Sequence, residues 1–208
     1  MPETETGEQL VVEATERIPP LVIRMQPDVR MTDDQFFDFC QINRDLRIER
    51  TAEGEILVMP PAGFQSGRRN AEITAQLTEW ARTDARGVVT DSSGGYTLPN
   101  HATRAPDAAW TLASRLASIS EEQQEKFLPL CPDFVIELRS RSDRLPDLQA
   151  KMEEYSANGA RLGWLIEPYQ RQVYVYRPGA VVQCLENPET ISGDPELPGF
   201  VLDLRKVW

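Results

Sequence analysis

Apolar and polar residues alternate most clearly in residues 132–140, in a short run that begins with a proline. In a β-strand, three apolar side chains of this run share one face, and Val135, Glu137 and Arg139 share the other. Such a short apolar run is typical of a central strand, so we expect Glu137 to be buried. A buried carboxylate is costly unless it is paired or binds a metal ion. We therefore expect a partner for Glu137, with Asp107 as the leading candidate.

Helices are predicted where a residue typical of a helix start precedes an apolar repeat. A capping box that begins at Thr32 predicts a helix over residues 32–43. Ser66 is expected to cap a long helix that continues to about residue 86. Two further helices are expected to begin near Ser120 and near Pro146.

Strands are predicted where apolar and polar residues alternate between turn residues. The predicted strands are residues 21–25, 46–50, 55–59, 88–90, 96–98, 108–111, 133–140, 162–166, 172–177 and 181–185. Strands 133–140 and 162–166 flank a helix, and a right-handed crossover would make them parallel. The interleaved elements predict an α/β fold with a mixed central sheet flanked by helices.

The chain of 208 residues is long enough for one domain with a substantial core. Residues 1–16 contain five glutamates and no lysine or arginine, so we interpret residues 1–19 as an acidic flexible tail. Residues 20–208 are expected to form a single domain, because no linker divides them.

The net charge of -11 makes non-specific binding of nucleic acid through overall charge unfavourable. A phosphate-binding surface would need a local basic patch. Five arginines close to the predicted site could form one: Arg68, Arg69, Arg139, Arg141 and Arg144. The alternative is that these arginines are scattered and solvated.

Histidine and cysteine are too few for several common types of site. His101 is the only histidine, which excludes a two-histidine metal site, and it lies in a polar loop. The three cysteines are widely separated, which excludes a thiolate zinc site. A bound metal would therefore have oxygen ligands, as magnesium or manganese prefer. The sequence contains no membrane-length apolar run, and we expect a cytoplasmic protein.

Asp107, Glu137 and Arg139 together would suffice for phosphodiester hydrolysis without histidine. Two carboxylates can hold a divalent cation, which polarises a phosphoryl oxygen and acidifies a bound water. A nearby cation can stabilise the charge that develops on the phosphate. The alternative interpretation is structural, with Glu137 paired to Arg139 or to a lysine.

The segments Pro106-Asp107 and Glu137-Leu138-Arg139 resemble the PD-(D/E)XK nuclease signature. Further segments in the same order make the chain similar to one branch, the Uma family of restriction endonucleases. These segments include residues 67–73, 93–99, 105–107, 132–138, 164–168 and 197–200, and the resemblance covers roughly residues 30–208. The resemblance implies a restriction-endonuclease-like core, Mg²⁺-dependent DNA cleavage with Mn²⁺ as a possible substitute, and often a homodimer.

By position, the resemblance implies that Asp107 and Glu137 are metal ligands and that Glu72 helps to orient the site. The signature has a lysine two residues after the glutamate, where this chain has Arg139. Arginine stays protonated, so it can bind phosphate but cannot act as a general base. Lys151 on the following helix is a possible substitute; the alternative is a surface lysine whose stem packs on its neighbours.

Two functions are the leading alternatives from the sequence, and a third is a structural component of an oligomer that assembles through the acidic tail and the strand at residues 181–185. The first is a Mg²⁺-dependent DNA endonuclease that uses Asp107, Glu137, Arg139, Lys151 and Glu72. The second is a catalytically inactive relative that binds nucleic acid or a protein partner, because the motif lysine is absent and the chain is acidic.

Overall fold

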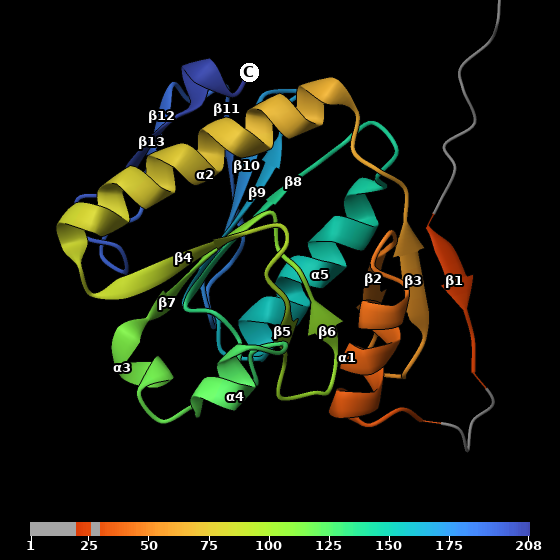
Figure 1. Ribbon diagram of the computed structural model, residues 1–208. Coiled ribbons are helices and arrows are strands. Elements are labelled where there is room, and N and C mark those ends of the chain that lie inside the picture. Colours follow the sequence, from red (N-terminus) through yellow and green to blue (C-terminus); the bar gives the residue numbers. More distant parts are fainter. Residues whose placement is uncertain (1–19, 26–29) are drawn as a thin grey trace, which may run out of the picture.

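A six-stranded mixed sheet forms the centre of the computed structural model, which describes residues 20–25 and 30–208 (Figure 1). The strands of this sheet, in spatial order, are β11 (Gln183–Glu186), β10 (Gln172–Tyr176), β9 (Leu162–Glu167), β8 (Phe134–Leu138), β7 (Ala108–Leu112) and β4 (Gly87–Asp91). Within the sheet β8 and β9 are parallel, as expected, and the other neighbouring pairs are antiparallel. The expected tail, residues 1–19, lies outside the described residues.

One long helix covers each face of this sheet (Figure 1). On one face Leu77 packs in the same buried cluster as Ile136, and on the other Tyr155 packs in the same cluster as Val135. The two helices are α2 (Phe64–Asp84) and α5 (Leu145–Ala157). The expected α/β fold, a mixed sheet flanked by helices, is confirmed.

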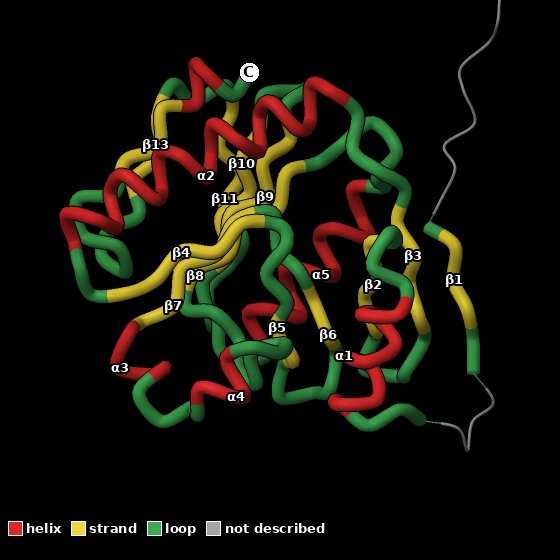
Figure 2. The backbone as a smooth tube through the Cα atoms, in the orientation of Figure 1, coloured by secondary structure: helices red, strands yellow, loops and turns green. Residues whose placement is uncertain are grey.

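A second sheet lies on the far side of α5 from the central sheet (Figure 2). Its strands, in spatial order, are β1 (Leu21–Ile23), β3 (Ile56–Met59), β2 (Arg47–Arg50), β6 (Thr103–Arg104) and β5 (Tyr96–Thr97). The β2–β3 hairpin and the Thr32 capping box of α1 (Asp33–Ile42) were both predicted. We did not predict that β5 and β6 join this hairpin, because a single residue pair, Arg50 with Thr103, links β2 to β6.

The remaining elements are short. A C-terminal hairpin and 3-10 helix place Leu202 and Leu204 in the cluster beneath α2. The short elements are α3 (Ala113–Leu116), α4 (Glu121–Gln124), β12 (Thr190–Ser192), β13 (Val201–Asp203) and η1 (Leu204–Lys206). Within residues 20–25 and 30–208, every helix is too short or too polar to cross a lipid bilayer.

The predicted boundaries of α2 were wrong at both ends. The helix begins at Phe64 after Gly63, which makes no side-chain capping hydrogen bond, so Ser66 lies inside the first turn. It ends at Asp84 because Ala85 adopts a left-handed conformation with φ of 54°. Gly87 begins β4 instead, where a Cβ atom would lie 2.4 Å from the ring of Trp110.

Candidate active site

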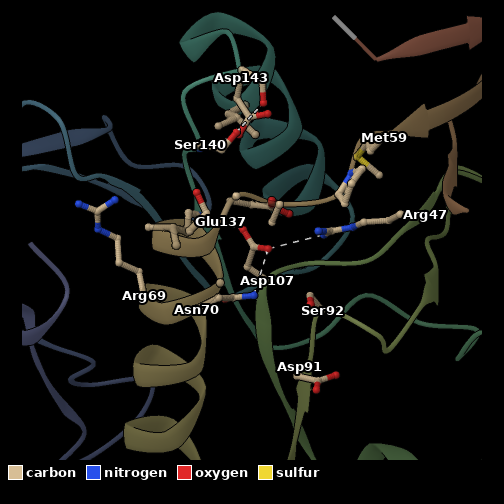
Figure 3. A pocket seen from close by; sticks show the side chains of 18 of the residues that line it. Arg47, Met59, Arg69, Asn70, Asp91, Ser92, Asp107, Glu137, Ser140 and Asp143 are labelled. Carbon is tan, nitrogen blue, oxygen red and sulfur yellow. Dashed lines mark hydrogen bonds and ion pairs between the residues drawn. The ribbon is translucent and has the colours of Figure 1, made fainter. Parts of the chain in front are cut away.

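Asp107 and Glu137 face each other across two neighbouring strands. The register of β7 and β8 pairs Ala108 with Ile136, and its continuation by one residue places Asp107 opposite Glu137. Because side chains alternate along a strand, both carboxylates project to the face that carries Val135 and α5. Figure 3 shows them together, between Arg47 and the first turns of α2. The structure therefore brings together the two acidic residues that the sequence singled out.

Glu137 is 3% exposed and has two partners on α5. Its Oε1 atom lies 2.8 Å from Lys151 Nζ and accepts a hydrogen bond of 3.0 Å from the Tyr155 hydroxyl. Lys151 Nζ also lies 2.9 Å from Oε1 of Glu49 on β2, and Oε2 of Glu49 lies 3.2 Å from Arg104 Nη1. Lys151 thus bridges two buried carboxylates from the two sheets.

The environment shifts the pKa values of these groups in different directions. Burial, together with the charges of Asp107 and Glu49, raises the pKa of Glu137 to about 7, although Lys151 opposes the shift. Burial also raises the pKa of Asp107, against the effect of Arg47. Burial would lower the pKa of Lys151, but the two glutamates next to it raise it overall, so Lys151 is charged at neutral pH. The pKa of Glu49 is lowered, because Lys151 and Arg104 outweigh its burial.

Asp107 is held by both backbone and side-chain groups. Its Oδ2 atom accepts a hydrogen bond of 2.8 Å from the backbone N–H of Leu138. Its Oδ1 atom accepts a long bond of 3.4 Å from Asn70 on α2 and lies 3.6 Å from Nη2 of Arg47 on β2. Asn70 Oδ1 is buried and has no partner among the described residues. Asp107 is therefore fixed in orientation, with a cation on one side.

The donors at this site fit a hard divalent cation. Asp107 and Glu137 offer carboxylate oxygens from adjacent strands, and Asn70, whose Nδ2 atom lies 3.4 Å from Asp107, carries a buried amide oxygen without a partner among the described residues. Oxygen ligands of this kind suit Mg²⁺ or Mn²⁺. In the part of the chain that is described, no three His, Cys, Asp or Glu side chains cluster as a complete metal site. A cation here would therefore be held by the two acidic residues, with its remaining ligands from other groups.

The site opens into a large cavity of about 1830 Å³. Its wall includes the first turns of α2, the β2–β3 hairpin, α5 and the segment that follows β8. Asp107, Glu137 and Lys151 lie in this wall together with Arg69 and Tyr169. The cavity is large enough to admit part of a polymeric substrate to the two carboxylates.

Arg139 does not contact the carboxylate pair. Its Nη1 atom lies 3.1 Å from Oε1 of Glu167, which is fully buried, and its Nε donates a bond of 3.3 Å to the Asp143 carbonyl. Arg139 shares a strand face with Glu137, but its side chain extends toward the end of β9. Lys151 from α5, and not Arg139, supplies the cation at Glu137.

Glu72 also lies away from the site. It accepts a hydrogen bond of 2.9 Å from Gln76 and lies 3.8 Å from Lys206, near the C-terminal segment. Glu72 is two residues after Asn70, and two helical residues differ in direction by about 200°. Since Asn70 faces Asp107, Glu72 faces the other way and is not part of the cavity wall.

Three residues of the site, Glu49, Arg47 and Asn70, were not predicted from the sequence. Arg47 and Glu49 share one face of a hairpin strand, a pattern that usually indicates a solvated face. Burial of that face against α5 follows from long-range packing of the second sheet, which no local pattern shows. Asn70 lies in residues 67–73, one of the segments that resemble the family. Only the side of α2 from which it projects, toward Asp107, distinguishes it from its neighbours.

Comparison with known proteins identifies the family and the fold. A family model, Uma2, described as "Putative restriction endonuclease", matches residues 33–205. A crystal structure from Anabaena variabilis, described as "a putative nuclease belonging to DUF820", is similar to this chain with a TM-score of 0.68 and 19% identity. The similarity covers 85% of this chain and 97% of the other. No curated protein matches the sequence.

Proposed function

The chain belongs to the Uma2 family, and we propose that it is a Mg²⁺-dependent DNA endonuclease, with Mn²⁺ as a substitute ion. Family and fold support a nuclease-like function; the metal and the DNA substrate are the parts we propose. The observation that carries the proposal is the placement of Asp107 opposite Glu137 in a cavity wall, with the Lys151 ammonium 2.8 Å from Glu137.

Asp107 and Glu137 would hold the metal ion. When bound, Mg²⁺ polarises a phosphoryl oxygen and acidifies a water molecule for attack on phosphorus. The Leu138 N–H and Asn70 fix the orientation of Asp107, and the Tyr155 hydroxyl fixes that of Glu137. The chain therefore presents two preorientated carboxylates from a rigid sheet.

Lys151 supplies the positive charge at the reacting phosphate. In hydrolysis, a new bond forms between phosphorus and the water oxygen, the bond to the leaving ester oxygen breaks, and negative charge increases around phosphorus. The raised pKa of Lys151 keeps its proton in place, so it stabilises this charge and does not act as a base. Arg47 provides a second cation on the far side of Asp107.

A plasmid-cleavage assay tests the proposal. Wild-type protein should convert supercoiled plasmid to nicked or linear DNA in Mg²⁺ or Mn²⁺ and should be inactive in EDTA. Asp107→Asn retains an acceptor for the Leu138 N–H but loses the charge, so it should fold and not cleave. Equal cleavage by wild type and variant, or no cleavage by either on duplex, single-stranded and mismatched DNA, would contradict the proposal.

A non-catalytic nucleic-acid-binding module is the second candidate. The Lys151 ammonium already compensates Glu137 and Glu49, as in a purely structural ion-pair network. Calorimetric titration with Mn²⁺ distinguishes the two functions, since an enzyme should bind the ion at Glu137 and an inert module should not. We also propose that the protein forms a homodimer, which light scattering would test.

A further inference from the structure

Three arginines from two segments, α2 and the residues after β8, lie around the ring of Tyr169. Their guanidinium carbons lie 5.0 Å (Arg141), 5.8 Å (Arg69) and 6.0 Å (Arg139) from the ring centroid. Tyr169 is 38% exposed and lies in the wall of the same cavity as Glu137. Contacts between guanidinium groups and an aromatic face are attractive, so the ring holds these positive charges together.

A buried carboxylate fixes the turn that carries Tyr169. Fully buried Glu167 accepts hydrogen bonds from the backbone N–H groups of Tyr169 (3.1 Å) and Gln170 (2.8 Å). The same carboxylate pairs with Arg139 at 3.1 Å. Arg139 is thereby neutralised and acts as a support, and the position of the Tyr169 ring is set by a buried network.

The other two arginines keep donors for a ligand. Arg141 is exposed and has no hydrogen bond or ion pair to any described side chain or backbone group. Arg69 uses its Nε atom for a bond of 2.7 Å to the Val207 carbonyl, and no described residue accepts from its terminal nitrogens. In Figure 3, Arg69 lies on the opposite side of Asp107 and Glu137 from Arg47. Two uncompensated guanidinium groups in a cavity wall match the charge and geometry of a phosphodiester.

We infer that Arg69, Arg141 and Tyr169 form a subsite for a backbone phosphate of the nucleic acid, beside the phosphate that is cleaved. This inference rests on the proposed function. It adds the place at which the nucleic-acid strand next to the cleaved phosphate is bound. In a chain with a net charge of -11, such a local patch supplies the attraction that overall charge does not.

Binding of a fluorescein-labelled 20-base-pair duplex in EDTA, followed by anisotropy at several salt concentrations, tests the subsite. Arg141→Ala should weaken binding by about 3–10-fold at low salt and reduce the slope of log affinity against log salt by about 1. Arg161→Ala is the matched control, because Arg161 is exposed and precedes β9, at the opposite end of the parallel pair from Arg139. Equal effects of the two variants would overturn the inference.

Two variants of Tyr169 separate the role of the ring from that of its hydroxyl. Tyr169→Phe keeps the platform for the arginines and should bind the duplex as wild type does. Tyr169→Leu removes the platform and should weaken binding to about the level of Arg141→Ala. Wild-type affinity in Tyr169→Leu would overturn the role of the ring.

The outcomes also separate this inference from the proposed function. If wild type binds the duplex, the arginine variants weaken binding and no metal-dependent cleavage occurs, the subsite stands and the catalytic proposal fails. If cleavage occurs and Arg141→Ala binds and cleaves as the control does, the subsite fails and the catalytic proposal stands. Absence of any binding by wild type in EDTA would overturn the subsite, and the cleavage assay in Mg²⁺ or Mn²⁺ would still decide the catalytic proposal.

Discussion

The ammonium of Lys151 on α5 lies 2.8 Å from the Glu137 carboxylate on β8. The nuclease signature places its lysine two residues after the glutamate, on the same strand, where this chain has Arg139. Arg139 is instead committed to Glu167, so a helix that crosses the same sheet face provides the missing cation. A positive charge therefore lies beside Glu137, although it comes from another element.

Lys151→Met should abolish the cation and destabilise the fold. Loss of a preorganised charge is expected to lower cleavage by about 100–1000-fold. Breaking a buried ion pair typically costs about 3–5 kcal/mol, and Glu137 and Glu49 each lose one partner here. Because Glu137 can take up a proton near pH 7, the loss of stability should be smaller at pH 6 than at pH 8.

Urea unfolding at both pH values and plasmid cleavage would measure these effects. Lys206→Met is the control, because Lys206 is an exposed lysine with only a 3.8 Å contact to Glu72. Wild-type cleavage by Lys151→Met would show that the 2.8 Å contact with Glu137 is structural only.

Glu137 should make the free energy of unfolding depend on pH. Its pKa is about 7 in the folded protein and 4.5 without the fold, so the folded state binds more protons between these values. Stability should therefore fall as pH rises through this window, by up to about 3 kcal/mol at 1.36 kcal/mol per pKa unit. The raised pKa of Asp107 acts in the same direction.

Urea denaturation of metal-free protein at pH 5, 6, 7 and 8 would measure this dependence. Glu137→Gln removes the titrating group and should flatten the profile over this range. An unchanged slope in the variant would show that other groups account for the pH dependence.

The central strand, the crossover helix and the two carboxylates were predictable from sequence because local patterns determine them. Asp107 precedes one strand and Glu137 lies within another, and pairing of those strands places both on one face. The burial of Glu49 was not predictable in this way. A single long-range pair, Arg50 with Thr103, attaches β6 to the hairpin, and Glu49 is buried there beside Lys151. Charge alternation in β2 alone gives no indication of that burial.

Asp107→Asn and Asp107→Ala should differ in stability and agree in metal binding. Asparagine can still accept from the Leu138 N–H, whereas alanine leaves that group and Arg47 without a partner. We expect Asp107→Ala to be less stable than Asp107→Asn by about 1–3 kcal/mol. Both should lower the affinity for Mn²⁺ at least tenfold, since each removes a charged ligand. Calorimetric titration would check the affinities, and wild-type affinity in either would contradict the assignment.

Glu49→Gln tests the residue that the sequence did not reveal. Glu49 is 2% exposed, and it contacts Lys151, Arg104 and the Ala105 N–H. The substitution keeps the shape and removes the charge, so we expect a loss of about 1–3 kcal/mol in stability. Removal of one of the two carboxylates that raise the pKa of Lys151 should also move the alkaline limit of cleavage to lower pH. A cleavage profile from pH 6 to 10 that matches wild type would argue against this coupling.

Glu72 and Asn70 make a matched pair on α2 for the final test. The resemblance assigned a site role to Glu72, but its contacts are Gln76 and Lys206, outside the cavity wall. Glu72→Ala should therefore change cleavage less than about twofold and stability by less than about 0.5 kcal/mol. Asn70→Ala removes a donor to Asp107 at 3.4 Å and a buried amide oxygen, and should lower cleavage by about tenfold. Since the two residues lie about 200° apart on one helix, a reversed order of effects would mean that the other face of α2 contacts the substrate.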